Sequence, residues 1–372
     1  MRNGSQEVTR NLVNTCLRAI YMPWYGLASA SLILAVALIA LGSGACSGPA
    51  KPVAVTWQSM GTFAEVMAAA DEQSALDGAT AGAKKRLESL EARLSIFQPV
   101  SEISNLNRSA GKSSVRLSRE TAEVLGLALR YAEGSGGAFD PTVGQLVRFW
   151  GFNKGSPPAS LPNQEEIATV LQRVGYCHLI VSNGAAFLDR EGMEVDLGGI
   201  AKGYAVDVCW REMAANKVKN FMVNLGGNIR CRGTAESGRA WSVGVKDPFD
   251  RDRNIGAIRL ADGMAVATSG NYEKFVEIGG KRYSHIVDPR TGRPVEGVAS
   301  VTVIATNAVE ADAMSTAIFV LGMKDAKPVL SRMPDCHVIF IPDTQPMKVY
   351  VSPGARKYFM AGPELAGEVG DM

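Results

Sequence analysis

The alternation of apolar and polar residues separates a helical first part of the chain from a strand-rich second part. Val53 to Met60 alternates as a half-buried strand does, and helical spacing follows over 75–94, 119–133 and 165–174. Short apolar runs typical of strands then recur at 178–182, 186–188, 220–224, 240–246, 256–260, 300–305 and 337–341. Helical patterns interrupt these runs at 201–216 and 310–322. This order predicts an α+β domain with a mainly antiparallel sheet.

The domain boundaries follow from composition. No repeat, low-complexity segment or long linker divides residues 53–355, so we expect them to form one folded domain. Residues 47–52 form a short linker before that domain. The end of the chain, residues 356–372, mixes Gly, Pro and Glu and is predicted to be a flexible tail.

Residues 1–46 have the pattern of an export signal. Basic residues precede an uncharged apolar run from Leu27 to Leu41, which at about 15 residues is shorter than the roughly 20 needed to span a membrane. Small residues then lead to Cys46 in a stretch similar to the lipobox of bacterial lipoproteins, although Ser43 stands where that pattern usually has an aliphatic residue. Lipidation of Cys46, ordinary signal cleavage and a retained N-terminal anchor remain three alternatives. Each places the following domain outside the cytoplasm.

Charge and cysteine usage narrow the classes of function. The formal net charge of +2 is spread evenly over 372 residues, so there is no basic face to attract nucleic acid. The six cysteines lie far apart and lack the close paired spacings of metal or redox sites. We interpret them mainly as buried single thiols, and a disulfide among the last four stays open because the compartment would permit one.

The densest polar motif runs from Asp196 to Asp207, where a strand end passes through two glycines into a helix that starts near Ile200. Glycines at such a place let backbone amides approach a phosphate group. Lys202 lies in the first helical turn, where the helix dipole disfavours a cation unless an anionic ligand is bound nearby. The motif therefore indicates an anion site at the start of this helix.

Two further glycine loops follow apolar strands, one with Gly226 and Gly227 and one with Gly270. Each loop, taken singly, is more often a turn than a binding site. Together with the Phe139–Thr142 loop, they favour a ligand with polar groups spread along its length, such as a dinucleotide.

The chain has three histidines, and their surroundings differ. His178 and His337 lie in apolar strand patterns and are interpreted as packed core residues. His285 stands near Asp288 and a tight Asp-Pro-x-Thr-Gly turn, where an imidazole can serve as a general base.

Asp312 and Thr316 lie four residues apart in a helical pattern and therefore share one helix face. A carboxylate and a hydroxyl are hard oxygen ligands suited to Mg²⁺, which takes phosphate oxygens and waters as its remaining ligands. The alternative is that Asp312 only caps the helix N-terminus.

Taken together, these segments resemble the ApbE family of FAD:protein FMN transferases across nearly all of residues 57–352, in the family's order. The matching blocks are Met60–Thr62, Phe97 with Ser101–Asn107, Phe139–Thr142, Asp196–Asp207, Asn224–Asn228, Thr268–Tyr272, His285–Pro294 and Ala311–Thr316.

The resemblance implies a T-fold-like α+β domain that binds FAD between its sheet and loops. It also implies a magnesium ion on the pyrophosphate, held by Asp312, Thr316 and the main-chain carbonyl of Gly199, a position that often carries alanine in the family. Lys202 would lie beside the phosphates, and His285 with Asp288 would assist proton removal from the incoming hydroxyl. Met60 and Phe97 would pack on the flavin or adenine rings. The other residues implied to bind the dinucleotide are Asp140, Thr142, Asp196, Asn224, Gly226, Gly227, Ser269, Gly270 and Asn271, with His285 beside them.

The implied reaction breaks the pyrophosphate of FAD, joins FMN to a Thr or Ser of an acceptor protein through a phosphoester bond, and releases AMP. The implied acceptors are membrane subunits of respiratory or electron-transfer complexes, and the implied location is the periplasmic face of the bacterial inner membrane. Two alternatives remain: an FAD pyrophosphatase that yields FMN and AMP, and an exported flavin carrier without catalysis. Asp312 and Thr316 argue against the carrier, because a mere carrier has no use for them.

Overall fold

The computed structural model describes residues 52–153, 157–365 and 368–372. The predicted export signal, with Cys46, and the linker up to residue 51 lie outside the described residues. Within the described part of the chain, none of the helices combines the length and the apolar character that crossing a membrane requires.

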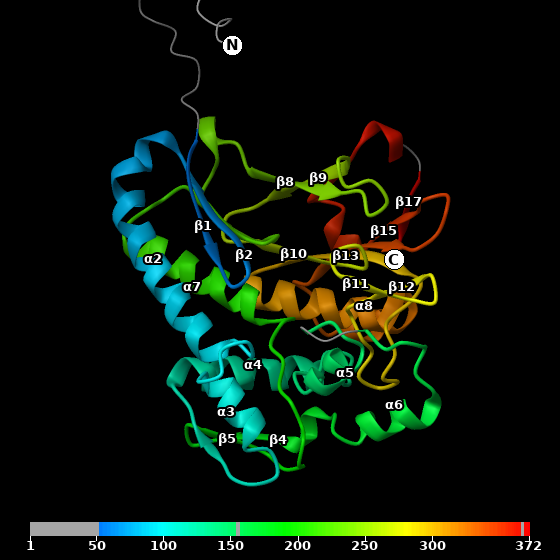
Figure 1. Cartoon of the computed structure of the whole chain (residues 1–372). Helices are drawn as coiled ribbons and strands as arrows, with labels where there is room; N and C mark the ends of the chain where they lie inside the picture. Colours follow the sequence, from blue (N-terminus) through cyan, green and yellow to red (C-terminus); the bar gives the residue numbers. More distant parts are fainter. Residues whose placement is uncertain (1–51, 154–156, 366–367) are drawn as a thin grey trace, which may run out of the picture. The chain divides into compact units, whose positions relative to one another are not determined.

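A nine-stranded sheet forms the centre of the described domain (Figure 1). Its strands follow the spatial order β1 (Val53–Ser59), β2 (Thr62–Ala68), β6 (Phe221–Leu225), β7 (Asn228–Arg232), β10 (Ala265–Gly270), β13 (Val298–Ala305), β14 (His337–Pro342), β15 (Val349–Val351) and β17 (Val369–Asp371). Neighbouring strands are antiparallel except for the parallel pair of β15 and β17. The α+β class with a mainly antiparallel sheet is therefore confirmed.

Layers of side chains cover both faces of this sheet. On one face, the helices α2 (Gln73–Leu94), α7 (Ala201–Ala215) and α8 (Ala308–Leu330) pack on the strands (Figure 1). On the other face lies a three-stranded sheet of β8 (Trp241–Lys246), β9 (Asn254–Leu260) and β16 (Phe359–Ala361). Because successive strand residues point to opposite faces, Val303 joins the helix-side core while Ile304 joins the other core.

The remaining elements extend the helix side of the domain. They are the helices α3 (Glu102–Arg108), α4 (Arg119–Gly134), α5 (Gly144–Phe149) and α6 (Gln164–Leu171), the small sheet of β3 (Val115–Arg116), β5 (Ala185–Leu188) and β4 (Leu179–Ser182), and the hairpin of β11 (Phe275–Ile278) and β12 (Lys281–Ser284). A third apolar cluster, in which Trp150 packs with Ile167 and Tyr283, joins α5 and α6 to that hairpin. Short 3₁₀ helices occupy Ala70–Glu72, Tyr176–His178, Glu236–Gly238, Pro353–Ala355 and Pro363–Leu365.

Most predicted elements are confirmed with shifts of a few residues at their ends. The helix predicted over 310–322 runs further, as α8, from Ala308 to Leu330, with a kink at Gly322 where φ is 69°. A positive φ is open to glycine at little cost, so the chain passes through a break there and then continues as a helix.

The predicted flexible tail is wrong. Residues 356–372 contribute β16, which pairs with β9, and β17, which pairs with β15. Leu365, between these strands, is buried in the core under β8 and β9. Strand β9 lies far from β16 in the sequence, whereas β15 lies shortly before the tail, and in both cases the composition of residues 356–372 gave no sign of the pairing.

Candidate active site

The strand register brings the predicted glycine loops to one end of the central sheet. Leu225 pairs with both Ala64 and Asn228, so the β1–β2 turn and the β6–β7 turn lie side by side. The Gly226 amide donates to the Phe63 carbonyl over 3.1 Å, which ties the two turns together. Val266 pairs with Ile229, so β10 reaches its last residues at the same end of the sheet. Three segments that are distant in the sequence thus lie together at one end of the central sheet.

The Asp196 loop leads into α7 and is fixed by its own side chain. The Asp196 carboxylate accepts from the Gly198 amide over 2.8 Å and from Asn153 Nδ2 over 2.9 Å. Lys202, in the first turn of α7, donates from Nζ to the Gly198 carbonyl over 3.2 Å and lies 3.8 Å from Asp312 Oδ1. The structure therefore joins the predicted anion site to the predicted metal-binding helix.

The close approach of α7 to α8 places Asp312 against the start of α7. The Gly203 amide donates to Asp312 Oδ2 over 2.8 Å. A Cβ at Gly203 would lie 2.7 Å from the Asp312 Cβ and closer still to the Ala308 carbonyl, so only glycine allows this packing. Asp312 is buried, which raises the pKa of its carboxyl, while Lys202 opposes that rise. A cation near this carboxylate would favour its charged form.

The three predicted magnesium ligands converge. A Cβ at Gly199 would lie 3.2 Å from Thr316 Oγ1, and Thr316 is one helical turn beyond Asp312 on α8. A contact of this length requires the neighbouring side chains to shift by only a few tenths of an ångström. Ser269, at the end of β10, lies with its Oγ 3.4 Å from Thr316 Oγ1 and 2.9 Å from Ser315 Oγ. Sequence reasoning did not single out Ser315, whose hydroxyl belongs to this cluster.

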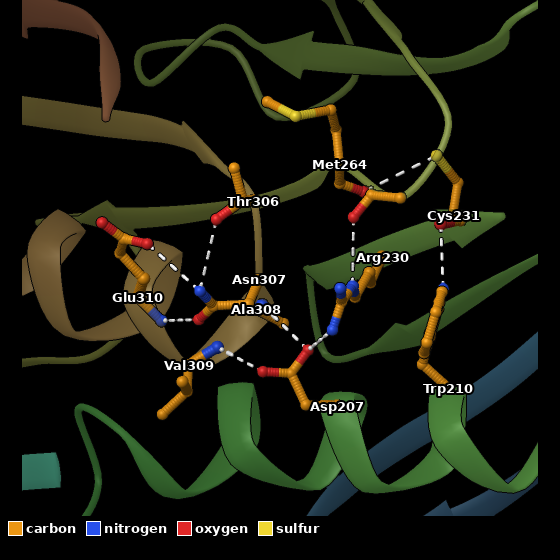
Figure 2. A network of polar contacts seen from close by, with 11 residues as sticks. Asp207, Trp210, Arg230, Cys231, Met264, Thr306, Asn307, Ala308, Val309 and Glu310 are labelled. Carbon is orange, nitrogen blue, oxygen red and sulfur yellow. Dashed lines mark hydrogen bonds and ion pairs between the residues drawn. The ribbon is translucent and has the colours of Figure 1, made fainter. Parts of the chain in front are cut away.

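Asp207 forms a bridge between α7 and the first turn of α8 (Figure 2). Its Oδ1 accepts from the Ala308 amide over 3.0 Å, and its Oδ2 accepts from the Val309 amide over 3.0 Å. Arg230 Nη1 donates to Oδ1 over 2.7 Å, and the Arg230 guanidinium lies 4.2 Å from the Trp210 ring. The sequence placed Asp207 inside the α7 motif without a role. In the structure it fixes where α8 begins, and hence where Asp312 and Thr316 lie.

His285 directly follows β12 and is held by its neighbour in the hairpin. Its Nδ1 lies 3.1 Å from the Lys274 carbonyl, and its ring packs edge-on against Phe152. A carbonyl only accepts hydrogen bonds, so Nδ1 carries the proton and Nε2 keeps a free lone pair. Burial, with smaller effects from the charges of Lys274 and Lys202, lowers the pKa of His285 to about 4. The ring is therefore neutral near pH 7, as a general base must be.

The predicted partnership of His285 with Asp288 finds no support in the structure. The Asp288 carboxylate accepts from the amide of Arg290 and from its guanidinium, each over 2.9 Å. The Gly292 amide donates to the Asp288 carbonyl over 2.8 Å. Asp288 therefore stabilises the turn after His285 rather than the imidazole itself.

The assignment of Asp140 and Thr142 to ligand binding is corrected by their burial. Asp140 accepts from the Thr142 amide over 2.7 Å and the Tyr176 amide over 2.8 Å, and Thr142 accepts from the Gly175 amide over 2.8 Å. Both side chains are buried, and burial raises the pKa of Asp140. These residues hold their own loop against residues 175–176, and that loop supports the site because Phe139 lies against Gly199.

Met60 and Phe97 line two separate cavities. Met60 and Gly61, with φ of 51° and 72°, form the two-residue turn between β1 and β2, and the Met60 amide donates to Glu91 over 2.8 Å. This turn lines a cavity of about 420 Å³. Phe97, with 51% of its surface exposed, lines a cavity of about 530 Å³ whose wall includes Asn153, the partner of Asp196. Both residues thus line cavities, and their packing on an aromatic ligand stays a prediction.

The remaining predicted contacts lie in turns at the same sheet end. Asn224 Oδ1 accepts from the Gly227 amide over 2.9 Å and so shapes the β6–β7 turn. Asn271 Nδ2 donates to Asp343 over 3.0 Å, and Gly270 lies so close to the Tyr272 ring that a Cβ would clash. These side chains make contacts within the protein, and their contact with a ligand stays a prediction.

The histidines and cysteines outside the site differ in part from expectation. His337 is buried, as predicted, but His178 lies at the end of a 3₁₀ helix with its Nδ1 3.1 Å from Asp189. Among the described cysteines, Cys209, Cys231 and Cys336 are buried and free, while Cys177 is free and exposed. The structure therefore pairs none of the four in a disulfide.

The donor set at Asp312 contains few acidic groups. Within the described residues, no cluster of three or more His, Cys, Asp or Glu side chains is arranged to hold a metal ion. The Gly199, Asp312 and Thr316 set contains one carboxylate, so a cation there would need ligands from a bound phosphate.

Three comparisons with known proteins identify relatives of this chain. The model of the ApbE family matches residues 60–340. An FAD:protein FMN transferase of Klebsiella pneumoniae is 31% identical over 337 residues, covering 88% of this chain and 96% of that protein. The solved flavin transferase ApbE from Vibrio cholerae superposes with a TM-score of 0.74 at 31% identity, covering 83% of this chain and all of that one. The apo form of the Pseudomonas stutzeri flavinyl transferase ApbE also gives 0.74, at 28% identity, with 85% and 99% covered. The chain belongs to the ApbE family.

Proposed function

We propose that this protein is an FAD:protein FMN transferase that breaks the pyrophosphate of FAD and joins FMN to a Thr or Ser hydroxyl of an acceptor protein. One observation carries the proposal: the start of α7 and the Asp312 face of α8 lie in direct contact. That contact brings an anion-binding helix start, a lysine and an oxygen ligand set together. Relatives that match most of the chain are named for this reaction.

The oxygen donors of the site fit magnesium. Gly199, Asp312 and Thr316 would supply a carbonyl, a carboxylate and a hydroxyl, all of the hard type that Mg²⁺ prefers. Bound there, the ion would neutralise charge on the pyrophosphate. Lys202 would add a second positive charge beside the same phosphates, 3.8 Å from Asp312.

His285 would act on the acceptor hydroxyl. Its Nε2 lone pair takes the hydroxyl proton as the oxygen bonds to the phosphorus on the FMN side. The bond from that phosphorus to the bridging oxygen breaks at the same centre, and AMP leaves with both electrons of that bond. If water takes the place of the acceptor, the same residues yield free FMN and AMP, so positioning of the acceptor decides the product.

A mass-spectrometric assay tests the proposal. The purified protein is incubated with FAD, Mg²⁺ and a Ser/Thr-containing acceptor segment, and we expect the segment to gain FMN while AMP appears in equal amount. Asp312→Ala and the shape-matched Thr316→Val should lose this activity. Asp77→Ala, which removes an exposed carboxylate on α2, is the control and should keep it. Free FMN in place of labelled acceptor would favour the pyrophosphatase, and intact FAD would favour the carrier.

The proposed location is the periplasmic face of the bacterial inner membrane, with membrane-bound electron-transfer subunits as acceptors. The signal pattern of residues 1–46 supports export, and Cys46 is the proposed lipid attachment site. Labelling growing cells with radioactive palmitate should mark the protein, and Cys46→Ser should abolish the label. An unlabelled parent protein that still reaches the periplasm would contradict lipidation and leave export intact.

A further inference from the structure

Asn228 is the first residue of β7, and it lies between the Gly226-Gly227 turn and the carboxylate of Asp312. It is buried, with 4% of its surface exposed, and its side chain lies close enough to Asp312 to lower the pKa of that carboxyl. Its Oδ1 is buried and lacks a hydrogen-bond partner within the described part of the chain. This combination marks Asn228 as a polar residue whose bonding is incomplete in the protein alone.

The direction of the amide follows from the chemistry of its neighbour. A carboxylate accepts hydrogen bonds and does not donate them, so the Nδ2 group of Asn228 must face Asp312. The opposite orientation would set the Asn228 oxygen against a carboxylate oxygen, and two acceptors repel each other. Oδ1 therefore points away from Asp312 as an acceptor without a donor.

A buried amide oxygen without a donor is uncommon, because burial removes water and nothing replaces it. In native structures, a bound water, ion or ligand completes the bonding of many such groups. Here the oxygen belongs to a residue that touches a predicted metal ligand and follows one of the glycine loops at the site. The missing donor is thus expected to arrive with the ligand.

We propose that Asn228 is a positioning residue of the active site, whose Nδ2 orients the Asp312 carboxylate and whose Oδ1 accepts from an O–H donor that enters with the magnesium–FAD complex. The donor is either a water on the cation or a hydroxyl of the dinucleotide, and the chemistry of the contact is the same in both. This inference rests on the proposed function, since it requires that Asp312 faces that complex.

The inference predicts an unusual mutational signature. Asn228→Ala removes an unsatisfied acceptor from the interior, while Asp312 retains the Gly203 amide and Lys202. The ligand-free melting temperature should therefore change by less than about 3 °C, which is within the shift that roughly 1 kcal/mol produces. Ligand binding should suffer instead, because outer contacts of metal ligands are typically worth roughly 10- to 100-fold in affinity.

Two binding titrations with the purified protein locate the donor. FAD is titrated in EDTA by flavin fluorescence, and Mn²⁺ is titrated at saturating FAD by the loss of its free EPR signal. Asn216→Ala is the matched control, because it removes a surface asparagine that bonds only within the last turn of α7. We expect Asn228→Ala to weaken at least one titration by about tenfold or more, while the control matches the parent.

The outcomes separate the inference from the function on which it rests. A loss confined to Mn²⁺ places the role of Asn228 on the metal side of the site, where Nδ2 orients Asp312 and metal-bound water can donate to Oδ1, and a loss in EDTA assigns the donor to the dinucleotide. If the parent binds both ligands and Asn228→Ala binds them equally well, or only melts earlier, the inference is overturned. A parent protein that binds neither ligand overturns the proposed function itself.

Discussion

Replacing Asp207 by alanine should weaken both the fold and the metal site, because one carboxylate serves two helices. The change removes the acceptor of the Ala308 and Val309 amides in the first turn of α8. It also leaves Arg230, whose side chain is 16% exposed, without its acidic partner. Arg230 keeps the Gly263 carbonyl and the Trp210 ring, so its charge stays partly compensated.

The expected magnitude follows from these losses. Loss of a helix cap costs about 1 kcal/mol, and removal of one partner from a buried ion pair costs about 3 to 5 kcal/mol. Because Arg230 retains other contacts, we expect about 3 kcal/mol for the loss of the ion pair. With about 1 kcal/mol for the helix cap, Asp207→Ala should cost about 4 kcal/mol in total. Asp207→Asn keeps the shape and one acceptor oxygen but loses the charge, so about 2 kcal/mol is expected.

Urea unfolding measures the free energy, and a double-mutant cycle isolates the pair. Combining Asp207→Ala with Arg230→Met should cost less than the sum of the single changes, since the double variant no longer buries an unpaired charge. In the folded fraction, the Mg²⁺ concentration for half-maximal FMN transfer should rise about tenfold in Asp207→Asn, because the first turn of α8, and with it Asp312, is held less rigidly. A cost below about 1 kcal/mol for Asp207→Ala, with an unchanged Mg²⁺ dependence, would refute the reasoning.

Four further predictions test other parts of the site. Transfer should fall with acidity only as the pH approaches the His285 pKa of about 4, and activity half lost near pH 6.5 would contradict a buried neutral base. In the unfolded chain His285 binds a proton near pH 6.5, whereas in the folded protein it does so only near pH 4. The free energy of unfolding should therefore fall as the pH drops from 6.5 towards 4, which urea unfolding at several pH values can follow. Gly203→Ala should cost about 1 to 3 kcal/mol and abolish Mn²⁺ binding, as measured by EPR, because a Cβ would separate α7 from α8. Asp140→Asn should lower the unfolding free energy by about 1 to 3 kcal/mol yet leave the FAD affinity of the folded protein within about twofold, and a large affinity loss without destabilisation would restore Asp140 as a ligand contact.

The sequence predicted the elements of this fold better than their partners. Alternating and helical patterns located α2, α7 and most core strands, because these elements bury one face or both. The prediction for the tail failed because β16 and β17 are short strands that depend on pairing with β9 and β15, which lie outside residues 356–372.

The sequence located site residues where the pattern was local, and it gave no information where burial decides the environment. Asp312 and Thr316 lie one turn apart on α8, as their spacing predicts, and His285 stands beside turn residues, while their roles stay predictions. Asp140 looked like a ligand contact in the sequence, and only the structure shows its oxygens turned to backbone amides. Asn228 was seen only as part of a family block, since an unfilled hydrogen bond is a property of the folded interior.

The most direct test of the central claim is anomalous diffraction from crystals grown with FAD and Mn²⁺ in place of Mg²⁺. The account predicts a manganese peak within bonding distance of the Gly199 carbonyl, Asp312 and Thr316, with the pyrophosphate of the flavin completing its ligands. A pyrophosphate bound elsewhere, with no peak between the start of α7 and the Asp312 face of α8, would contradict it.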